Sequence, residues 1–333
     1  MIVEELALGI EIGGTKLQVG LGKRNGELLL LQQGKVPENA NAITILEWLT
    51  QTIHTLLSEA AEMELPPPVA LGIGFGGPVD ATNGIALVSH QVPGWEQFPL
   101  KSWFAERFPE IRICIENDSN ASGWAEYCLG TGKGTRNFCY MNIGSGIGGA
   151  LVLNGRLHNG QGMGAAEIGH TWIPDENAKK PGAMIHLEDS CSGWAIEKLA
   201  RAMDVTPSSI LHGLSEGNQN NITCAMLAEA ARAGDFQANE VIESTARRIA
   251  IALSNVVTLV HPECIAIGGG VAHWGVLLTE PLTHYLNEFV FTPFKNTFTV
   301  QCCALQDKVV VTGAILLALQ LVEKNSKTAT INP

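Results

Sequence analysis

The sequence predicts an α/β protein built from two copies of one fold. The first observation is a repeated pattern of strand, glycine turn and strand, IEIGGTKLQVG near the start of the chain and MNIGSGIGGALVL further on. Gly144 lies 131 residues after Gly13, which is close to the length of a whole domain. The second observation is composition. Of the 333 residues, 46% are hydrophobic and 16% are charged, which is enough apolar sequence for the cores of about two domains.

Hydrophobic periodicity predicts the elements of the first half. Alternating apolar residues on both sides of Gly13-Gly14-Thr15 predict two strands joined by a glycine turn. Apolar residues at steps of three and four after Ala42 predict a long helix, which the prolines at 66–68 end. In chain order we expect strands 6–12 and 17–22, helix 42–63, strands 69–75 and 111–115, and a helix capped by Ser119 or Asn120 that ends near Leu129.

The second half repeats this succession of strands and helices. A glycine turn at 144–146 separates predicted strands 140–143 and 150–153. Apolar steps from Ile242 to Val260 predict a long helix, because His261-Pro262 then ends it. The remaining predicted elements are strands 264–267 and 297–304 and a last helix, 312–323.

Charge and composition exclude several classes of protein. The 33 acidic and 21 basic residues give a net charge of -12, which would repel a nucleic-acid backbone. The first five residues lack a basic stretch, and no apolar run approaches the roughly 20 residues needed to span a bilayer. We therefore expect a cytoplasmic protein with no membrane and no nucleic-acid partner. The eight cysteines show no metal-ligand spacing, so we expect most of them to be reduced and buried.

Glycine loops at strand ends are the first functional signal. Two segments match G-x-G-x-x-G, but Pro78 follows the first and a strand-like run follows the second, which disfavours a dinucleotide-binding fold. Several glycine loops instead predict backbone N–H groups that converge on a polyphosphate. The alternative for each single loop is a tight turn that requires positive φ. These loops are Gly13-Gly14-Thr15, Gly144-Ser145-Gly146 and Gly268-Gly269-Gly270.

Asp118 is the candidate general base. It follows a predicted strand and precedes a predicted helix, the position at which open α/β sheets bind ligands. A carboxylate there can take the proton of a substrate hydroxyl as that hydroxyl attacks phosphorus. The alternative is that Asp118 caps the helix, and the two roles are compatible.

Glu167 and His170 form a second polar group, three residues apart in a glycine-rich stretch that predicts a loop. A single E-x-x-H pair does not make a di-iron bundle, which needs two copies on long helices. Polar side chains on such a loop suit hydrogen bonds to a polyhydroxylated ligand. The alternative is a structural, hydrogen-bonded histidine.

Together these residues resemble the ROK family of sugar kinases and regulators. The resemblance covers about residues 8–320 and implies a duplicated ribonuclease-H-like fold, that of the actin-like ATPases, with two lobes and a cleft between them. Residues 1–116 and the C-terminal helix 312–325 would form the small lobe, and residues 117–311 the large lobe with most of the sugar-binding residues. The motifs are IGGTK at 12–16, GFGGPVD at 74–80, ENDSNA at 116–121, IGSGIGG at 143–149, EIGH at 167–170 and IGGGV at 267–271.

The resemblance implies an ATP-dependent hexose kinase in which Asp118 activates the sugar 6-hydroxyl. The implied substrate, a hexose or N-acetylhexosamine, would contact Gly77, Asn117, Asp118, Glu167, His170 and Glu188. Mg²⁺ would be bound through ATP with help from Glu11. The residues implied to bind the nucleotide are Glu11, Gly13, Gly14, Thr15, Lys16, Gly144, Ser145, Gly146, Gly268, Gly269 and Gly270.

The chain departs from the family pattern at four places. Glu11 stands where members usually carry aspartate, and Gln91 where many carry asparagine. The family's zinc site, a histidine and three cysteines, should fall between His170 and Glu188, yet residues 171–187 contain no cysteine, so we expect no zinc site. The run 306–309 replaces a more usual small, acidic one.

Two alternatives come from other functional classes. The family includes sugar-responsive repressors with a DNA-binding domain, but the first strand begins near Leu6 and leaves no room for one, and the net charge is acidic. A catalytically silent sugar-binding protein is the other alternative, which Glu11 and the missing cysteines favour and Asp118 disfavours. A homodimer is the expected assembly.

Overall fold

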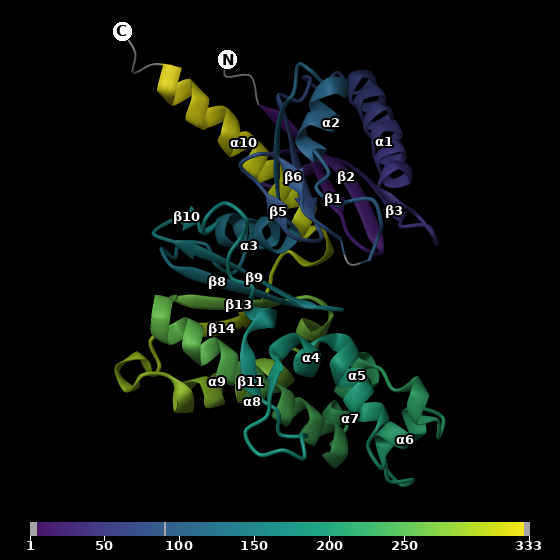
Figure 1. The fold of residues 1–333 in the computed structure, drawn as a ribbon, viewed down its shortest axis with the longest axis vertical. Helices are drawn as coiled ribbons and strands as arrows, with labels where there is room; N and C mark the ends of the chain where they lie inside the picture. Colours follow the sequence, from purple (N-terminus) through teal and green to yellow (C-terminus); the bar gives the residue numbers. More distant parts are fainter. Residues whose placement is uncertain (1–4, 90, 330–333) are drawn as a thin grey trace. The chain divides into compact units, whose positions relative to one another are not determined.

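The computed structural model describes residues 5–89 and 91–329 and divides the chain into two compact units (Figure 1). Unit 1 comprises Met1–Lys133, Leu157–Ala165 and Asp307–Pro333, and unit 2 comprises Gly134–Arg156 and Ala166–Gln306. The first boundary falls at 133/134 rather than at the expected 116/117. The reason is that the helix after Asn117 packs against the C-terminal helix of unit 1.

Unit 1 is built on a five-stranded mixed sheet in the order β3-β2-β1-β4-β7. The three N-terminal strands are antiparallel neighbours, whereas β1, β4 and β7 run parallel. A two-stranded ribbon of β5 and β6 lies outside it. The bounds are β1 Leu6–Ile12, β2 Lys16–Lys23, β3 Leu28–Lys35, β4 Ala70–Phe75, β5 Val79–Asp80, β6 Ile85–Ala86 and β7 Arg112–Asn117.

Helices cover both faces of this sheet. α1 (Ala42–Glu62) and α2 (Leu100–Arg107) contribute to one apolar core, together with the even-numbered residues of β1. α3 (Asp118–Leu129) and α10 (Val309–Ala329) pack against each other and against the other face. A strand buried on both faces reads as a continuous apolar run, which explains the sequence of β1.

Glycines in the strands let α10 lie directly on the sheet. A Cβ atom on Gly72 would lie 1.9 Å from the carbonyl oxygen of Ala314, and one on Gly9 would lie 2.4 Å from that of Val311. Neither distance is tolerated by a real side chain. The first G-x-G-x-x-G match therefore contributes Gly72 to helix packing rather than to a phosphate loop.

Unit 2 repeats the topology of unit 1, since its sheet has the order β10-β9-β8-β13-β14. Again a hairpin pairs antiparallel on one side of the founding strand, and two parallel strands follow on the other side. The predicted duplication is thus confirmed. The strands are β8 Phe138–Ile143, β9 Ile147–Leu153, β10 Arg156–Leu157, β13 Cys264–Gly268 and β14 Thr299–Cys302.

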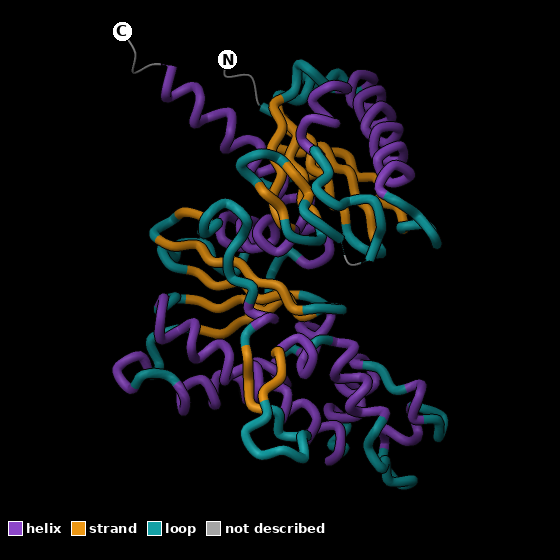
Figure 2. The backbone as a smooth tube through the Cα atoms, in the orientation of Figure 1, coloured by secondary structure: helices purple, strands orange, loops and turns teal. Residues whose placement is uncertain are grey.

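The helices of unit 2 form a large apolar core with this sheet. Figure 2 shows a short strand pair, β11 and β12, apart from the five-stranded sheet. The predicted helix 242–260 is the second part of α8, whose N-cap is Asp235. The remaining bounds are β11 Trp172–Pro174, β12 Met184–His186, α4 Leu187–Cys191, α5 Gly193–Arg201, α6 Ile210–Leu214, α7 Cys224–Arg232, α8 Phe236–Val260 and α9 Val276–Phe289.

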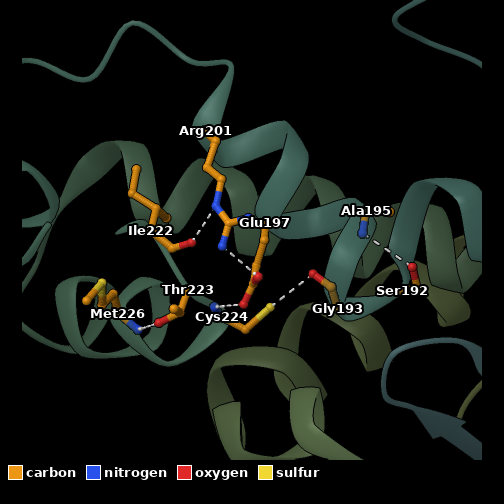
Figure 3. Close-up of polar contacts among 9 residues, drawn as sticks. All are labelled: Ser192, Gly193, Ala195, Glu197, Arg201, Ile222, Thr223, Cys224 and Met226. Carbon is orange, nitrogen blue, oxygen red and sulfur yellow. Dashed lines mark hydrogen bonds and ion pairs between the residues drawn. The ribbon is translucent and has the colours of Figure 1, made fainter. Parts of the chain in front are cut away.

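Polar contacts fix the start of α5 against α7 (Figure 3). The Cys224 thiol donates to the Gly193 carbonyl over 3.5 Å, and the Cys224 N–H donates to Glu197 over 3.0 Å. Arg201 in turn donates to Glu197 and to the Ile222 carbonyl. The N–H of Gly193 donates to the Gly144 carbonyl over 2.8 Å, so this network also supports the glycine turn at 144–146.

All eight cysteines are free thiols, but only Cys139, Cys191 and Cys264 are fully buried. Within residues 5–89 and 91–329, no helix has the length and apolar character needed to cross a bilayer.

Candidate functional site

In unit 1, the predicted residues gather where the parallel strands β1, β4 and β7 end. The Gly76 N–H donates to the Ile12 carbonyl over 2.8 Å, which joins the end of β4 to the end of β1. The Asn117 side-chain amide donates to the Gly77 carbonyl over 3.1 Å and joins β7 to the same edge. The structure therefore brings together the first glycine turn, Gly77 and Asn117, as expected for carboxyl ends of parallel strands.

Asn117, and neither Ser119, Asn120 nor Asp118, is the N-cap of α3. Its side-chain oxygen accepts from the N–H groups of Ser119 and Asn120 over 2.9 and 3.2 Å. This corrects the expected cap, because the helix begins at Asp118, two or three residues earlier than a cap at Ser119 or Asn120 implies. The amide side chain of Asn117 therefore caps the helix, and the carboxylate of Asp118 in the first turn can serve another role.

The Asp118 carboxylate lies at the helix N-terminus. Its Oδ1 accepts from the Ser119 N–H over 2.7 Å. A Cβ built on Gly76 would lie 3.5 Å from Oδ2, so glycine leaves space beside that oxygen. Backbone N–H donation at a helix N-terminus favours the ionised form of a carboxylate, the form that a general base requires.

Glu116 forms a buried network that the sequence did not predict. Its Oε1 accepts from the Asn117 N–H and the Asn120 amide, both over 3.0 Å. Its Oε2 accepts from the Asn159 amide over 2.6 Å. Burial raises the pKa of Glu116 although these hydrogen bonds lower it. Asn159 lies on the segment Leu157–Ala165, which belongs to unit 1 although its sequence neighbours belong to unit 2.

Glu11 is a second buried carboxylate in unit 1, at 8% exposure. Burial raises its pKa to about 7; Lys16 lowers it, while Asp118 and Asp307 raise it. The Lys16 ammonium lies 3.1 Å from Glu11 Oε2 and donates to the Asp307 carbonyl over 3.0 Å.

Gln91 lies against the first glycine turn. A Cβ on Gly14 would fall 1.1 Å from the side-chain oxygen of Gln91, so the amide occupies the space that a side chain at Gly14 would fill. Gln91, which stands where many family members carry asparagine, therefore contacts the predicted phosphate loop.

In unit 2, two predicted glycine loops lie at the ends of neighbouring parallel strands. Gly268 pairs with Asn142 in the ladder between β13 and β8. Gly269 has φ of +80°, and a Cβ on it would lie 2.5 Å from the Ile143 carbonyl oxygen. Gly144 directly follows Ile143, so the loops at 144–146 and 268–270 start side by side. Both the turn geometry and the close approach require glycine here.

Glu188 borders the loop at 144–146. It lies in the first turn of α4, and its Oε2 accepts from the Ile147 N–H over 2.6 Å. A Cβ on Gly146 would lie 2.6 Å from the same oxygen. A predicted sugar-binding residue and a predicted nucleotide loop are therefore in contact.

Glu167 and His170 belong to one short segment that is anchored to β9. His170 ends a single 3-10 turn, Ile168–His170, rather than lying in an irregular loop. Ile168 and Gly169 are buried, and a Cβ on Gly169 would lie 2.3 Å from the Ile147 carbonyl oxygen. Glu167 and His170 stay exposed on either side of this anchor.

The residues near His170 do not fit the family's zinc site. Residues 171–187 contain no cysteine, and His186 is the nearest nitrogen ligand in that stretch. Among the described residues, no group of three or more histidine, cysteine or acidic side chains has a metal-binding arrangement. A structural zinc needs about four ligands, mostly thiolates and imidazoles.

Comparison with known proteins places the chain among sugar kinases. It matches the ROK family over residues 7–321. The glucokinase of Thermotoga maritima is 29% identical over 309 residues, which are 92% of this chain and 95% of the relative. The xylose repressor of Caldicellulosiruptor bescii is 24% identical over 315 residues, which are 94% of this chain and 77% of the repressor.

A solved structure agrees with these relatives. A ROK family glucokinase from Streptomyces griseus, in complex with glucose and AMPPNP, gives a TM-score of 0.77 at 29% identity and covers 95% of this chain and 99% of that one. The predicted duplicated actin-like ATPase fold is confirmed.

Proposed function

Because the chain belongs to the ROK family, we propose that it is an ATP-dependent hexose kinase that transfers the γ-phosphoryl group to a sugar hydroxyl, the 6-hydroxyl. The observation that carries this proposal is the arrangement around Asp118. A carboxylate stands at the end of a parallel strand, is held in a helix N-terminus by one of its oxygens, and has glycine beside the other.

Asp118 would act as general base. As the sugar hydroxyl attacks the γ-phosphorus, its proton passes to Asp118 while the bond from phosphorus to the bridging oxygen of ADP breaks. Asn117 supports this role because it caps α3 with its oxygen and holds the Gly77 carbonyl with its nitrogen. Asn117 and Gly77 therefore fix the strand end that carries the base.

We propose that the glycine turns of each unit bind the nucleotide. Gly13, Gly14, Thr15 and Lys16 in unit 1, and Gly144–Gly146 with Gly268–Gly270 in unit 2, would face ATP. Bare backbone N–H groups at such turns suit phosphate oxygens. The structure of the Streptomyces griseus relative with an ATP analogue supports ATP as the donor.

Glu11 fits a role in holding Mg²⁺ with ATP. Its carboxylate is buried, and the Lys16 ammonium, 3.1 Å from Oε2, is its ion-pair partner. Mg²⁺ prefers oxygen ligands and keeps several waters, so a carboxylate can bind it through water. The bound ion would neutralise phosphate charge as the transfer proceeds. Lys16 supplies a positive charge beside Glu11 in its absence.

Glu167, His170 and Glu188 would bind the remaining sugar hydroxyls. All three are polar side chains held on backbone that buried residues anchor, which is the arrangement that orients a polar ligand. Among hexoses and N-acetylhexosamines, the glucokinase relatives favour glucose as the first sugar to test.

The decisive experiment measures ADP release from Mg-ATP with glucose, fructose, mannose, allose, N-acetylmannosamine and N-acetylglucosamine. We expect one sugar to stimulate turnover in the wild type, and Asp118→Asn to lose it. Asp204→Asn is the matched control, because Asp204 is an exposed aspartate of unit 2. Equal turnover in Asp118→Asn and wild type would contradict the role of Asp118.

The similarity to a xylose repressor favours one second candidate, a sugar-binding or sugar-responsive regulatory protein without kinase activity. The same experiment distinguishes the two. Sugar binding measured by calorimetry, with no ADP release for any sugar, would replace the kinase proposal with this candidate.

The remaining expectations stay predictions. We propose that the protein acts in the cytoplasm as a homodimer and binds no nucleic acid. Analytical ultracentrifugation at micromolar concentration measures the assembly directly.

A further inference from the structure

The short strand pair of unit 2 places His170 and Glu188 at the same end of one ladder. Trp172 of β11 pairs with His186 of β12, and the Leu187 N–H donates to the Thr171 carbonyl over 2.9 Å. His170 precedes Trp172 by two residues, and Glu188 follows His186 by two. The ladder therefore ties the segment of one proposed sugar ligand to that of the other.

Aromatic contacts continue this link into the side chains. The His186 and Trp172 rings lie 4.0 Å apart between centroids, tilted by 48°. The His186 ring then meets the His170 ring edge to face, at 5.6 Å and 75°. Edge-to-face contacts of this kind are favourable and directional, so His186 limits the orientation of His170. We call Trp172 and His186 the aromatic clamp.

The clamp stands where the family pattern would place a metal. The imidazoles of His170 and His186 and the Asp189 carboxylate, 3.7 Å from His186 Nδ1, are too few to form a structural zinc site. Ring contacts, by contrast, need only the shape of His186 and not its nitrogen atoms. Substitution of His186 can therefore distinguish positioning of His170 by ring contacts from positioning by a metal ion.

We propose that the aromatic clamp positions His170 for sugar binding and does so without a metal ion. The proposal rests on the kinase function proposed above, since His170 is its sugar ligand. His186 and Trp172 are positioning residues: they act through His170 and need not touch the sugar.

The test compares His186→Ala with His186→Phe, using glucose and Mg-ATP, or the preferred sugar of the panel above. Loss of the ring should raise the sugar KM about tenfold, since small misplacements of a ligand cost this much or more, with kcat changed less than twofold. Phenylalanine keeps a ring and should leave the KM within about threefold of wild type. Met184→Ala is the matched control, because Met184 is an exposed residue of the same strand.

A second variant guards against a folding defect. Trp172→Ala should raise the KM as His186→Ala does, and thermal unfolding of each variant verifies that it is folded.

Treatment with a chelator, followed by return of Mg²⁺, should change neither the melting temperature nor the sugar Kd measured by calorimetry.

Three results would overturn the proposal: an unchanged KM in folded His186→Ala, a His186→Phe as impaired as His186→Ala, or sugar binding lost to the chelator and restored by Zn²⁺. Each of these leaves the kinase function intact, because the wild type still turns over. Failure of the wild type to bind or phosphorylate any sugar would instead remove the kinase function, and the clamp proposal with it.

Discussion

The two sheets share one topology but carry different chemistry. In unit 1 the ends of the parallel strands hold buried carboxylates, and burial raises the pKa of both Glu11 and Glu116. In unit 2 the candidate residues Glu167 and His170 are exposed, and His170 contacts the His186 ring. Under the proposed function, one copy of the duplicated fold carries the carboxylates that bind a proton or a cation. The other copy carries the residues that orient the sugar.

The largest expected effect is a loss of kcat in a unit 1 variant, which contrasts with a rise in KM in a unit 2 variant. Asp118→Asn should lower kcat about 10³-fold, within the usual range for loss of a general base. Glu188→Gln should mainly raise the sugar KM, by about tenfold, because the proposed sugar ligand loses its charge. The amide oxygen can still accept from the Ile147 N–H, so the loop at 144–146 should be preserved. Steady-state kinetics measures both. A Glu188→Gln enzyme with normal KM and a large loss of kcat would end the division between the units.

The next effect concerns stability of unit 1. Gly72→Ala should destabilise the protein by about 3 kcal/mol, because the new methyl group meets the backbone of α10 and neither sheet nor helix can yield cheaply. The control is Gly213→Ala, which adds a methyl in open space within helix α6 and should be neutral or stabilising by up to about 1 kcal/mol. Urea unfolding followed by circular dichroism measures both. Equal midpoints for the two variants would show that α10 adapts to the added methyl.

A smaller effect tests the Glu116 network. Asn159→Ala removes the donor to Glu116 Oε2 and should cost about 2 kcal/mol, since a buried charged acceptor is left with one partner fewer. Asn177→Ala, at an exposed asparagine, is the control. Thermal unfolding gives the shift, and a midpoint equal to that of the control would mean that water replaces the Asn159 amide.

The smallest effect is a pH dependence through Glu11. Because its pKa is raised to about 7, lowering the pH from 7 to 6 reduces the ionised fraction. The reduction is about fivefold, and only the ionised form attracts a cation. The apparent affinity for Mg²⁺ with ATP should therefore rise with pH through this window and level off above pH 8. Titrations with Mg²⁺ at several pH values measure it, and Glu11→Gln should remove this part of the dependence. An identical profile in Glu11→Gln would assign the dependence to another group.

Local sequence patterns predicted the strands on either side of Gly13 and Gly144 and the parallel strands β4, β7, β13 and β14, because each depends on neighbouring residues. They did not predict β3 or the short strands β10, β11 and β12. The repeat around Gly13 and Gly144 predicted the same hairpin in both sheets, and the structure has it in both. The role of Gly72 in helix packing was not predicted, since nothing near it in the sequence shows that a helix from residues 309–329 will lie on it.

The candidate site also contains residues that the local sequence predicts and contacts that it does not. Asp118 could be identified because its place between strand and helix is a local property. The bond from Asn159 to Glu116 could not, because it joins positions 43 residues apart with no periodic signal. The aromatic clamp escaped prediction for a related reason: the register of β11 against β12 decides which rings meet.

The position of α10 has a consequence for how the protein is made. The strands of unit 1 leave the ribosome first, yet the helix that covers one face of that sheet contains residues 309–329. Unit 2 is synthesised in between. The face of the first sheet around Gly9 and Gly72 therefore stays uncovered until α10 has been synthesised. A chain truncated before α10 would lack the helix that covers this face.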